Sequence, residues 1–131
     1  MIFGVGTDIV SVPRVRRLLT RFGDEFAKRI LAQGEWPAYR ASQRPDYFLA
    51  KCFAAKEAFA KALGTGMRKP VYFRSIGIRR NALGRPEIQP EPELALFLSQ
   101  HGVQRWHLSL ADEQDMAIAF VVMEQGEGAA A

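Results

Sequence analysis

Glu57 and Lys61 are the first candidates for chemistry, because they place a carboxylate and an ammonium four residues apart in a stretch dense in helix-forming residues. Small residues on the same side of the predicted helix leave room for a ligand or another backbone close by. The alternative is an ordinary surface ion pair, worth a few tenths of a kcal/mol on an exposed helix. The spacing alone leaves both interpretations open.

Asp8 is a second carboxylate in a setting that could bind a ligand. In the predicted strand from Ile2 to Val10 it shares one face with Gly4 and Gly6, so an open lane along the strand would end in its carboxylate. Glycine in a strand often marks the close approach of a ligand or of another backbone. The alternative is that the two glycines accommodate a packed helix and that Asp8 begins a turn.

Two further features could bind phosphate. The turn Gly64-Thr65-Gly66 precedes a basic loop, and such a turn can bind phosphate through backbone N–H groups, although a simple helix stop explains it too. His107 lies on the face of its predicted strand away from Trp106 and Leu108. It could donate a hydrogen bond to a phosphate or could be an exposed polar residue.

A long helix must position Glu57 and Lys61. Asp46 is the predicted N-cap of this helix, and Gly64 is the predicted left-handed residue at its end. A set of apolar residues recurs at helical spacing and is predicted to face the core: Phe48, Cys52, Ala55, Phe59 and Ala62.

The rest of the chain predicts shorter helices and strands. The helices are expected at 12–22, 24–34, 35–42 and 90–100, and the strands at 2–10, 73–80, 86–89, 106–110 and 116–123, with a turn over 111–115. We expect an α+β fold in which a long central helix and shorter helices pack on one antiparallel sheet. Residues 1–124 would form a single domain, and 125–131 a flexible C-terminal tail.

Composition indicates a soluble globular protein with an anionic partner. The 131 residues carry a net charge of +4, and the sequence pI is about 9.6. Cys52 is the single cysteine, so an intrachain disulfide is impossible. With no signal peptide, the simplest expectation is a reducing, cytoplasmic location. The longest apolar run, from Met116 to Met123, is too short to cross a bilayer, so no membrane partner is expected.

The first predicted helix is strongly basic. Arg14, Arg17 and Arg21 line one of its faces, with no interleaved aromatic residues. A solvated basic face is the simpler interpretation. The functional one is a docking surface, which suits an acidic helix better than stacked single-stranded bases, so nucleic acid is not the expected partner.

Three stretches and one turn, taken together, resemble a known family. They are Gly4-Val5-Gly6-Thr7-Asp8-Ile9, Phe53-Ala54-Ala55-Lys56-Glu57-Ala58 with Lys61 and Gly64-Thr65-Gly66, His107-Leu108-Ser109-Leu110-Ala111-Asp112-Glu113, and the turn Gly84-Arg85-Pro86. In order and spacing they resemble the holo-acyl-carrier-protein synthases, the small class of 4′-phosphopantetheinyl transferases, over about residues 1–124. A single motif would be weak evidence, but three in order are specific.

The resemblance implies a reaction and a set of site residues. The phosphopantetheine arm of coenzyme A would move to a serine of an apo acyl carrier protein, releasing 3′,5′-ADP and serving fatty acid biosynthesis. Asp8 and Glu57 would bind Mg²⁺, and Glu57 would be the candidate base, directly or through a metal-bound water. Lys61 and His107 would lie near the coenzyme A phosphates, with Lys61 stabilising the leaving group. Gly64-Thr65-Gly66 would form part of the coenzyme A site.

The resemblance also implies partners. The acidic carrier protein would dock on Arg14, Arg17 and Arg21, with Leu18 and Phe22 adding apolar contact, and the family is typically a homotrimer with coenzyme A sites between subunits. One departure is Cys52, which stands where related chains commonly have arginine. A coenzyme A phosphate contact or an interface contact would then be missing, or would be supplied by Lys51 or Arg68.

Two other functions compete with the enzyme. A non-catalytic binding module would explain the basic helix but would leave Asp8 and Glu57 without a purpose, since two carboxylates repel phosphate unless a metal intervenes. A coenzyme A-binding protein without transfer activity is less consistent with a chain that keeps both carboxylates and Lys61.

Overall fold

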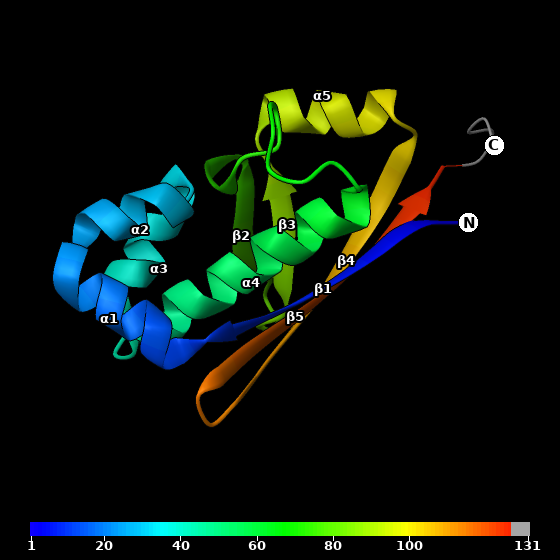
Figure 1. The fold of residues 1–131 in the computed structure, drawn as a ribbon. Coiled ribbons are helices and arrows are strands. Elements are labelled where there is room, and N and C mark those ends of the chain that lie inside the picture. The colour runs from blue at the N-terminus through cyan, green and yellow to red at the C-terminus, as the bar shows by residue number, and fades with distance from the viewer. Residues whose placement is uncertain (127–131) are drawn as a thin grey trace.

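The computed structural model describes residues 1–126 (Figure 1). Short 3₁₀ turns are labelled η. The elements in chain order are β1 (Ile2–Ser11), α1 (Val12–Phe22), α2 (Asp24–Ile30), η1 (Gln33–Glu35), α3 (Trp36–Ala41), α4 (Pro45–Leu63), η2 (Phe73–Ser75), β2 (Ile76–Arg80), β3 (Pro86–Pro90), α5 (Pro92–Gln100), β4 (Val103–Glu113) and β5 (Met116–Gln125). The α+β class expected from the sequence is therefore confirmed.

The strands form two antiparallel sheets instead of the single sheet that was expected. One has the order β1-β5-β4, with β5 in the centre, and the other contains β2 and β3 alone. The 73–89 hairpin was predicted to join the large sheet, and that prediction was wrong. Its contact with β4 includes a side chain, because the indole Nε1 of Trp106 donates to the carbonyl of Ile88 at 2.9 Å.

The long helix α4 lies directly on β1, and two glycines make this possible (Figure 1). A Cβ built on Gly4 would stand 2.0 Å from the carbonyl oxygen of Ala62, and one built on Gly6 would stand 2.0 Å from that of Ala58. The lane along β1 is thus filled by the helix backbone and is not open to a ligand. Of the two interpretations of these glycines, close helix packing is the one observed.

The ends of α4 are set by proline and glycine. Pro45 occupies the first turn and Arg44 is the N-cap, so the prediction of Asp46 as N-cap was wrong. Proline suits this position because its fixed φ is helical and no N–H is needed there. The Asp46 carboxylate instead accepts hydrogen bonds from neighbouring groups, including one from the guanidinium of Arg16 at 2.8 Å. Gly64 ends the helix with φ 85°, as predicted.

The shorter elements differ from prediction mainly at their ends. Ser11 caps α1 and Gly23 ends it, as expected. Helix α2 stops at Ile30, short of the predicted Gly34, because Leu31 is extended and buried. The β4–β5 turn is shorter than predicted because β4 continues to Glu113. Strand β5 reaches Gln125, whose N–H donates to the carbonyl of Met1 at 2.7 Å, and 127–131 of the expected tail lie outside the described residues.

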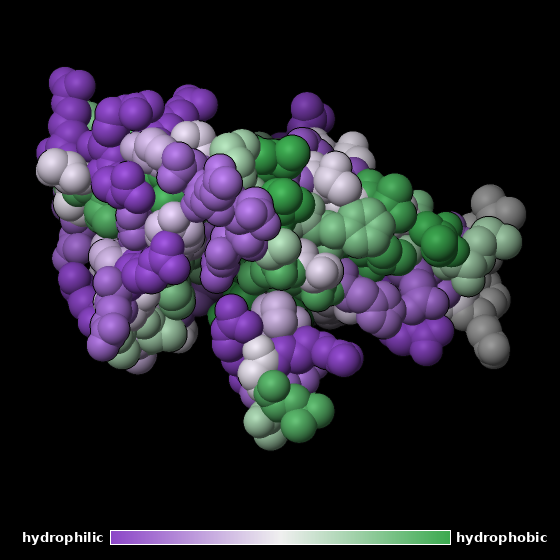
Figure 2. All heavy atoms as spheres, turned by 90° about the horizontal axis from the view of Figure 1, so that it is seen from below, coloured by the Kyte–Doolittle hydropathy of each residue, from purple (hydrophilic) through white to green (hydrophobic). Residues whose placement is uncertain are grey.

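The large sheet has one covered face and one open face. The covered face packs on α4, and the predicted helix stripe is buried there and against the other helices, apart from the partly buried Phe48. The open face carries apolar side chains, including Val5 and Ile9 on β1 and Ile118 and Phe120 on β5, with Phe120 42% exposed. Figure 2 shows hydrophobic side chains gathered across the middle and right of the lower surface, while its left end is hydrophilic.

Candidate active site

Lys61 and Asp8 meet where α4 crosses β1. The ammonium of Lys61 donates to Asp8 Oδ1 at 3.0 Å and to the carbonyl of Thr7 at 2.9 Å. The Asp8 side chain is only 16% exposed, whereas that of Lys61 is 53% exposed. The ammonium therefore reaches a recessed carboxylate from the solvent side. This contact depends on Gly4 and Gly6, which bring the helix close to the strand.

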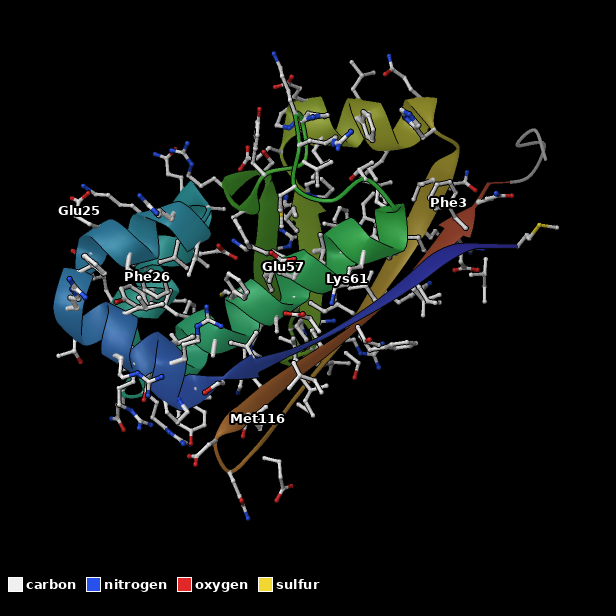
Figure 3. The ribbon with its side chains drawn as sticks, in the orientation of Figure 1. Phe3, Glu25, Phe26, Glu57, Lys61 and Met116 are labelled. Atoms are coloured by element: carbon white, nitrogen blue, oxygen red, sulfur yellow. The ribbon has the colours of Figure 1, made fainter. Side chains whose placement is uncertain are left out.

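Glu57 lies one turn before Lys61 on α4 (Figure 3), and the charges of Asp8 and Lys61 both act on its carboxyl. Its side chain is partly buried, and burial raises the pKa of the Glu57 carboxyl. The negative charge of Asp8 raises that pKa further, while Lys61 opposes the shift. Within residues 1–126, no hydrogen bond joins Glu57 to Lys61, whose ammonium is bound to Asp8 instead. The simple surface pair considered from the sequence is therefore not what forms.

The donor set of this group fits a magnesium ion. Asp8 and Glu57 offer carboxylate oxygens from two different elements, and Mg²⁺ is usually held by one or two carboxylates together with waters and substrate phosphates. Across the described part of the chain, no cluster of three or more His, Cys, Asp or Glu side chains is arranged to hold a metal. Two carboxylates of this kind could hold Mg²⁺ only together with waters or substrate phosphates.

His107 is not brought to these residues within one chain. Asp8 lies opposite Ala119, which is buried under α4, whereas His107 lies opposite Val122, on the other face of the sheet. The imidazole Nε2 of His107 is 2.6 Å from Glu124 Oε2. This hydrogen bond is the main cause of the lowered pKa of the Glu124 carboxyl.

The glycine turn follows directly after Lys61 on the chain. Gly64 and Gly66 both have positive φ, at 85° and 68°. The Thr65 hydroxyl donates to the carbonyl of Gly66 at 2.9 Å, which stabilises the turn internally. The turn is thus an exposed loop at the end of α4 that lies next to the charged group in sequence.

The basic residues of α1 are exposed. Arg14, Arg17 and Arg21 make no ion pair within residues 1–126, unlike Arg16, which binds Asp46 of α4 at 2.8 Å. The Arg21 guanidinium lies 5.1 Å from the centre of the Phe22 ring. Leu18 and Phe22 belong to a pocket of about 440 Å³ between α1, α2 and α4, which is lined by Leu18, Phe22, Glu25, Phe26, Arg29, Ile30, Phe53 and Phe73. An apolar hollow therefore adjoins the basic face.

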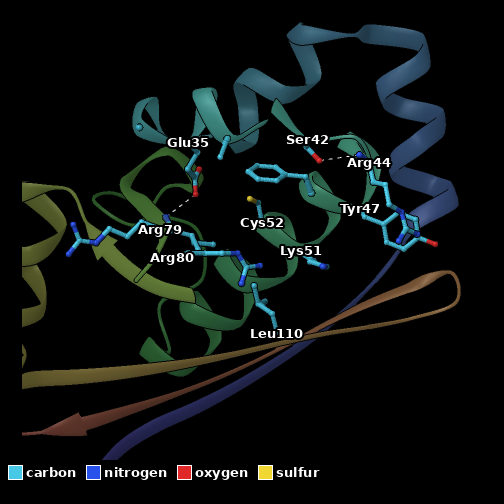
Figure 4. Close-up of a pocket in the computed structure, with 13 residues that line it drawn as sticks. Glu35, Ser42, Arg44, Tyr47, Lys51, Cys52, Arg79, Arg80 and Leu110 are labelled. Atoms are coloured by element: carbon cyan, nitrogen blue, oxygen red, sulfur yellow. Dashed lines mark hydrogen bonds between the residues drawn. The ribbon is translucent and has the colours of Figure 1, made fainter. Parts of the chain in front are cut away.

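Cys52 lines a different pocket, of about 400 Å³, beside several basic residues (Figure 4). Burial raises the pKa of the Cys52 thiol to about 12, so the thiolate is not available near neutral pH. The neighbouring Lys51 is held by Asp112 at 2.6 Å. Arg44, Arg79 and Arg80 are the other basic residues of this pocket.

A buried ion pair was missed in the sequence. Lys56 stands immediately before Glu57, and its side chain is fully buried against Glu35, with 2.6 Å between Nζ and Oε1. The available signal was spacing: Lys56 follows Cys52 by one turn and precedes Phe59 by three residues, which places it among the apolar residues of α4.

Comparisons with known proteins identify the class. The family model of the 4′-phosphopantetheinyl transferase superfamily matches residues 4–121. A holo-[acyl-carrier-protein] synthase of Thiobacillus denitrificans is 55% identical over 125 residues, covering 95% of each chain. This chain belongs to the 4′-phosphopantetheinyl transferase superfamily, and within it to the holo-[acyl-carrier-protein] synthases.

Solved structures agree with this assignment. The crystal structure of holo-[acyl-carrier-protein] synthase from Neisseria meningitidis has a TM-score of 0.93 at 51% identity, covering 95% of this chain and 100% of that chain. A holo-(acyl-carrier-protein) synthase from Bacillus anthracis, solved in complex with CoA (3′,5′-ADP), has a TM-score of 0.79 at 34% identity, covering 96% of this chain and 99% of that chain. The family and the fold expected from the three motifs are confirmed. Among the described helices, none has the length and apolar character needed to span a membrane.

Proposed function

We propose that this chain transfers the 4′-phosphopantetheine arm of coenzyme A to a serine of an apo acyl carrier protein, releasing 3′,5′-ADP, in a Mg²⁺-dependent reaction that serves cytoplasmic fatty acid biosynthesis. The observation that carries the proposal is the contact of Lys61 with Asp8 where α4 crosses β1, beside a Glu57 carboxyl whose pKa both of them shift, in a chain of this family. The catalytic unit would be residues 1–124.

Asp8 and Glu57 would hold Mg²⁺. When bound, the ion would neutralise the pyrophosphate of coenzyme A and polarise the phosphorus under attack. Glu57 would also accept the proton of the acceptor serine, directly or through a water molecule. Lys61 would stabilise the charge that develops on the departing 3′,5′-ADP.

The coenzyme A site would span two subunits. Gly64, Thr65 and Gly66 would contact coenzyme A beside Lys61. His107 would contact a coenzyme A phosphate, but it lies on the open face of the sheet, away from Asp8. Its participation therefore requires a second copy of the chain to bring another active site to this face. The exposed apolar residues on the same face support such a contact, and we propose a homotrimer.

The carrier protein would dock on α1. Arg14, Arg17 and Arg21 are exposed and make no ion pair within residues 1–126, so they could engage acidic side chains of the carrier. Leu18 and Phe22 would place apolar carrier residues over the adjoining pocket. A basic surface of this kind should chiefly raise the rate at which the carrier associates with the enzyme, and its contribution should fall as salt concentration rises.

The direct test is a transfer assay read by mass spectrometry. The protein is incubated with coenzyme A, Mg²⁺ and an apo acyl carrier protein, and the carrier is then weighed. We expect a gain of one phosphopantetheine arm that EDTA abolishes and that Asp8→Asn prevents. A folded protein that modifies none of several apo carriers would contradict the proposal and would favour a binding module.

A further inference from the structure

The Asp8 carboxylate already holds a positive charge supplied by the chain itself. The Lys61 ammonium occupies Oδ1 of Asp8 at 3.0 Å and is also fixed by the carbonyl of Thr7 at 2.9 Å. Asp8 would be one of the two metal ligands under the proposed function. The same carboxylate is therefore the partner of two different cations, one internal and one external.

The surroundings of Asp8 explain why an internal cation is needed. The negative charge of Asp8 raises the pKa of the Glu57 carboxyl, and the positive charge of Lys61 lowers it. Asp8 is recessed, so solvent screens its charge only partly. Without a cation, two carboxylates would repel each other at this junction. Lys61 offsets that repulsion when no metal is bound.

Lys61 is also able to leave. Its side chain is 53% exposed. The ammonium is carried on a flexible four-carbon stem, so it can move away from Asp8 without a change in the backbone. The ammonium donates two hydrogen bonds to β1, one to Asp8 Oδ1 and one to the carbonyl of Thr7. A divalent cation on Asp8 would repel the ammonium at that short range and would replace it as the counter-ion.

We propose that Lys61 is an exchangeable counter-ion, which neutralises Asp8 in the metal-free protein and is released from Asp8 when a divalent cation binds. The released ammonium becomes available to an anionic group of the substrate, such as a pyrophosphate, only after the cation is in place. The order of events at the site is thereby set by one lysine. This inference rests on the proposed metal site and adds an exchange step to it.

Metal binding without substrate tests the exchange. Mn²⁺ is titrated by EPR into the wild type, Lys61→Met and Lys28→Met, with no coenzyme A present. Lys28 is a matched control because its ammonium pairs with Glu25 at 3.1 Å on the surface of α2. We expect Lys61→Met to bind Mn²⁺ about twofold to fivefold more tightly than the wild type, a factor set by the strength of a partly exposed ion pair. Lys28→Met should match the wild type.

The ammonium itself provides the second readout. In ¹⁵N- and ¹³C-labelled protein, the Lys61 ammonium resonance should be protected from solvent exchange without metal and should lose that protection when Mg²⁺ is added. Unchanged affinity in Lys61→Met, or a Lys61 resonance that Mg²⁺ leaves protected, would overturn the exchange while the metal site stands. Absence of Mn²⁺ binding by the wild type without coenzyme A would overturn the exchange, which requires a cation to bind before the substrate. The EDTA-controlled carrier-modification assay would then report separately on the proposed metal-dependent reaction.

Discussion

Lys56 Nζ lies 2.6 Å from Glu35 Oε1 in the interior of the protein, with side-chain exposures of 0% and 3%. The ammonium also donates to the carbonyl of Ile30 at 2.6 Å, at the end of α2. The carboxylate accepts from the N–H groups of Ala32 and Ile78, at 2.7 Å and 2.8 Å. No buried side-chain nitrogen or oxygen in the described residues lacks a partner. This network joins α4 to α2, η1 and β2.

Breaking this pair on one side should destabilise the protein strongly. Lys56→Met leaves the Glu35 carboxylate buried without its cation, and we expect a loss of about 3–5 kcal/mol in the free energy of unfolding. Replacing both, as in Glu35→Leu with Lys56→Met, should cost less than Lys56→Met alone, although two backbone N–H groups then lose their acceptor. Urea unfolding followed by circular dichroism measures both variants. A loss below about 1 kcal/mol for Lys56→Met would contradict the expectation.

Gly6→Ala should separate α4 from β1. The added Cβ would stand 2.0 Å from the carbonyl oxygen of Ala58, and neither backbone can yield cheaply. Overpacking usually costs about 1–3 kcal/mol, and this contact should lie at or above the upper end of that range. The expected result is a lower melting temperature and loss of transfer activity, since the Asp8–Lys61 contact depends on the same packing. Gly34→Ala is the matched control, because nothing lies within 4 Å of a Cβ at that position, and it should leave both properties near wild type.

Glu57→Gln should lower transfer activity and, when no metal is bound, raise the stability of the fold. The pKa of the Glu57 carboxyl is raised above its ordinary value of 4.5, so folding favours the protonated form. Its contribution to stability is therefore fully present below pH 4.5 and is lost as pH rises through the folded-state pKa.

The neutral glutamine avoids that loss. With EDTA present, Glu57→Gln should be more stable than the wild type at pH 7, and the difference should shrink as the pH approaches 4. Transfer activity should fall by about a hundredfold or more, as expected for removal of a base and a ligand. Thermal unfolding at a series of pH values measures the first effect. A variant that is less stable than the wild type at pH 7 would argue against the assigned charge environment.

Arg14→Gln should weaken the use of the carrier protein without affecting coenzyme A. Because the guanidinium is exposed and points to no partner in residues 1–126, its loss should raise KM for the carrier severalfold and leave KM for coenzyme A nearly unchanged. The effect should diminish at high salt. Arg16→Gln removes the same charge from the same helix, but that arginine is bound to Asp46, so it should have the smaller effect on carrier KM. Equal increases in both KM values for Arg14→Gln would indicate a folding defect.

Phe120→Glu should disrupt the proposed trimer. Phe120 is 42% exposed at the centre of the open sheet face, where a second copy would bury it. A charge at that position would have to be desolvated on assembly, so light scattering should report a smaller species than the wild type. Secondary structure should be retained, because the side chain points away from the core. A wild type that is monomeric at micromolar concentration would contradict the proposed trimer.

Local sequence patterns predict most of the helices and strands of this protein. Helices α1 and α4 begin and end near the predicted positions, at prolines, glycines and a serine cap. Helix ends depend on local hydrogen bonding and backbone preference, which are visible in the sequence. The strand at 2–10 and the central returning strand followed from alternation and apolar runs. The motifs containing Asp8, Glu57 and Lys61 also indicated the correct family.

Which of these residues come into contact follows from the packing of distant segments. The spacing along α4 predicts an ion pair between Lys61 and Glu57. Because β1 lies close to the helix, Lys61 instead donates to the recessed Asp8 carboxylate and to the carbonyl of Thr7. Burial of Lys56 depends on Glu35, an acceptor 21 residues away in sequence. The position of His107 on the open face follows from the register between β4 and β5, and the β2–β3 hairpin forms a sheet of its own. These outcomes depend on contacts between segments that are distant in the sequence, and local sequence patterns do not report the energies of such contacts.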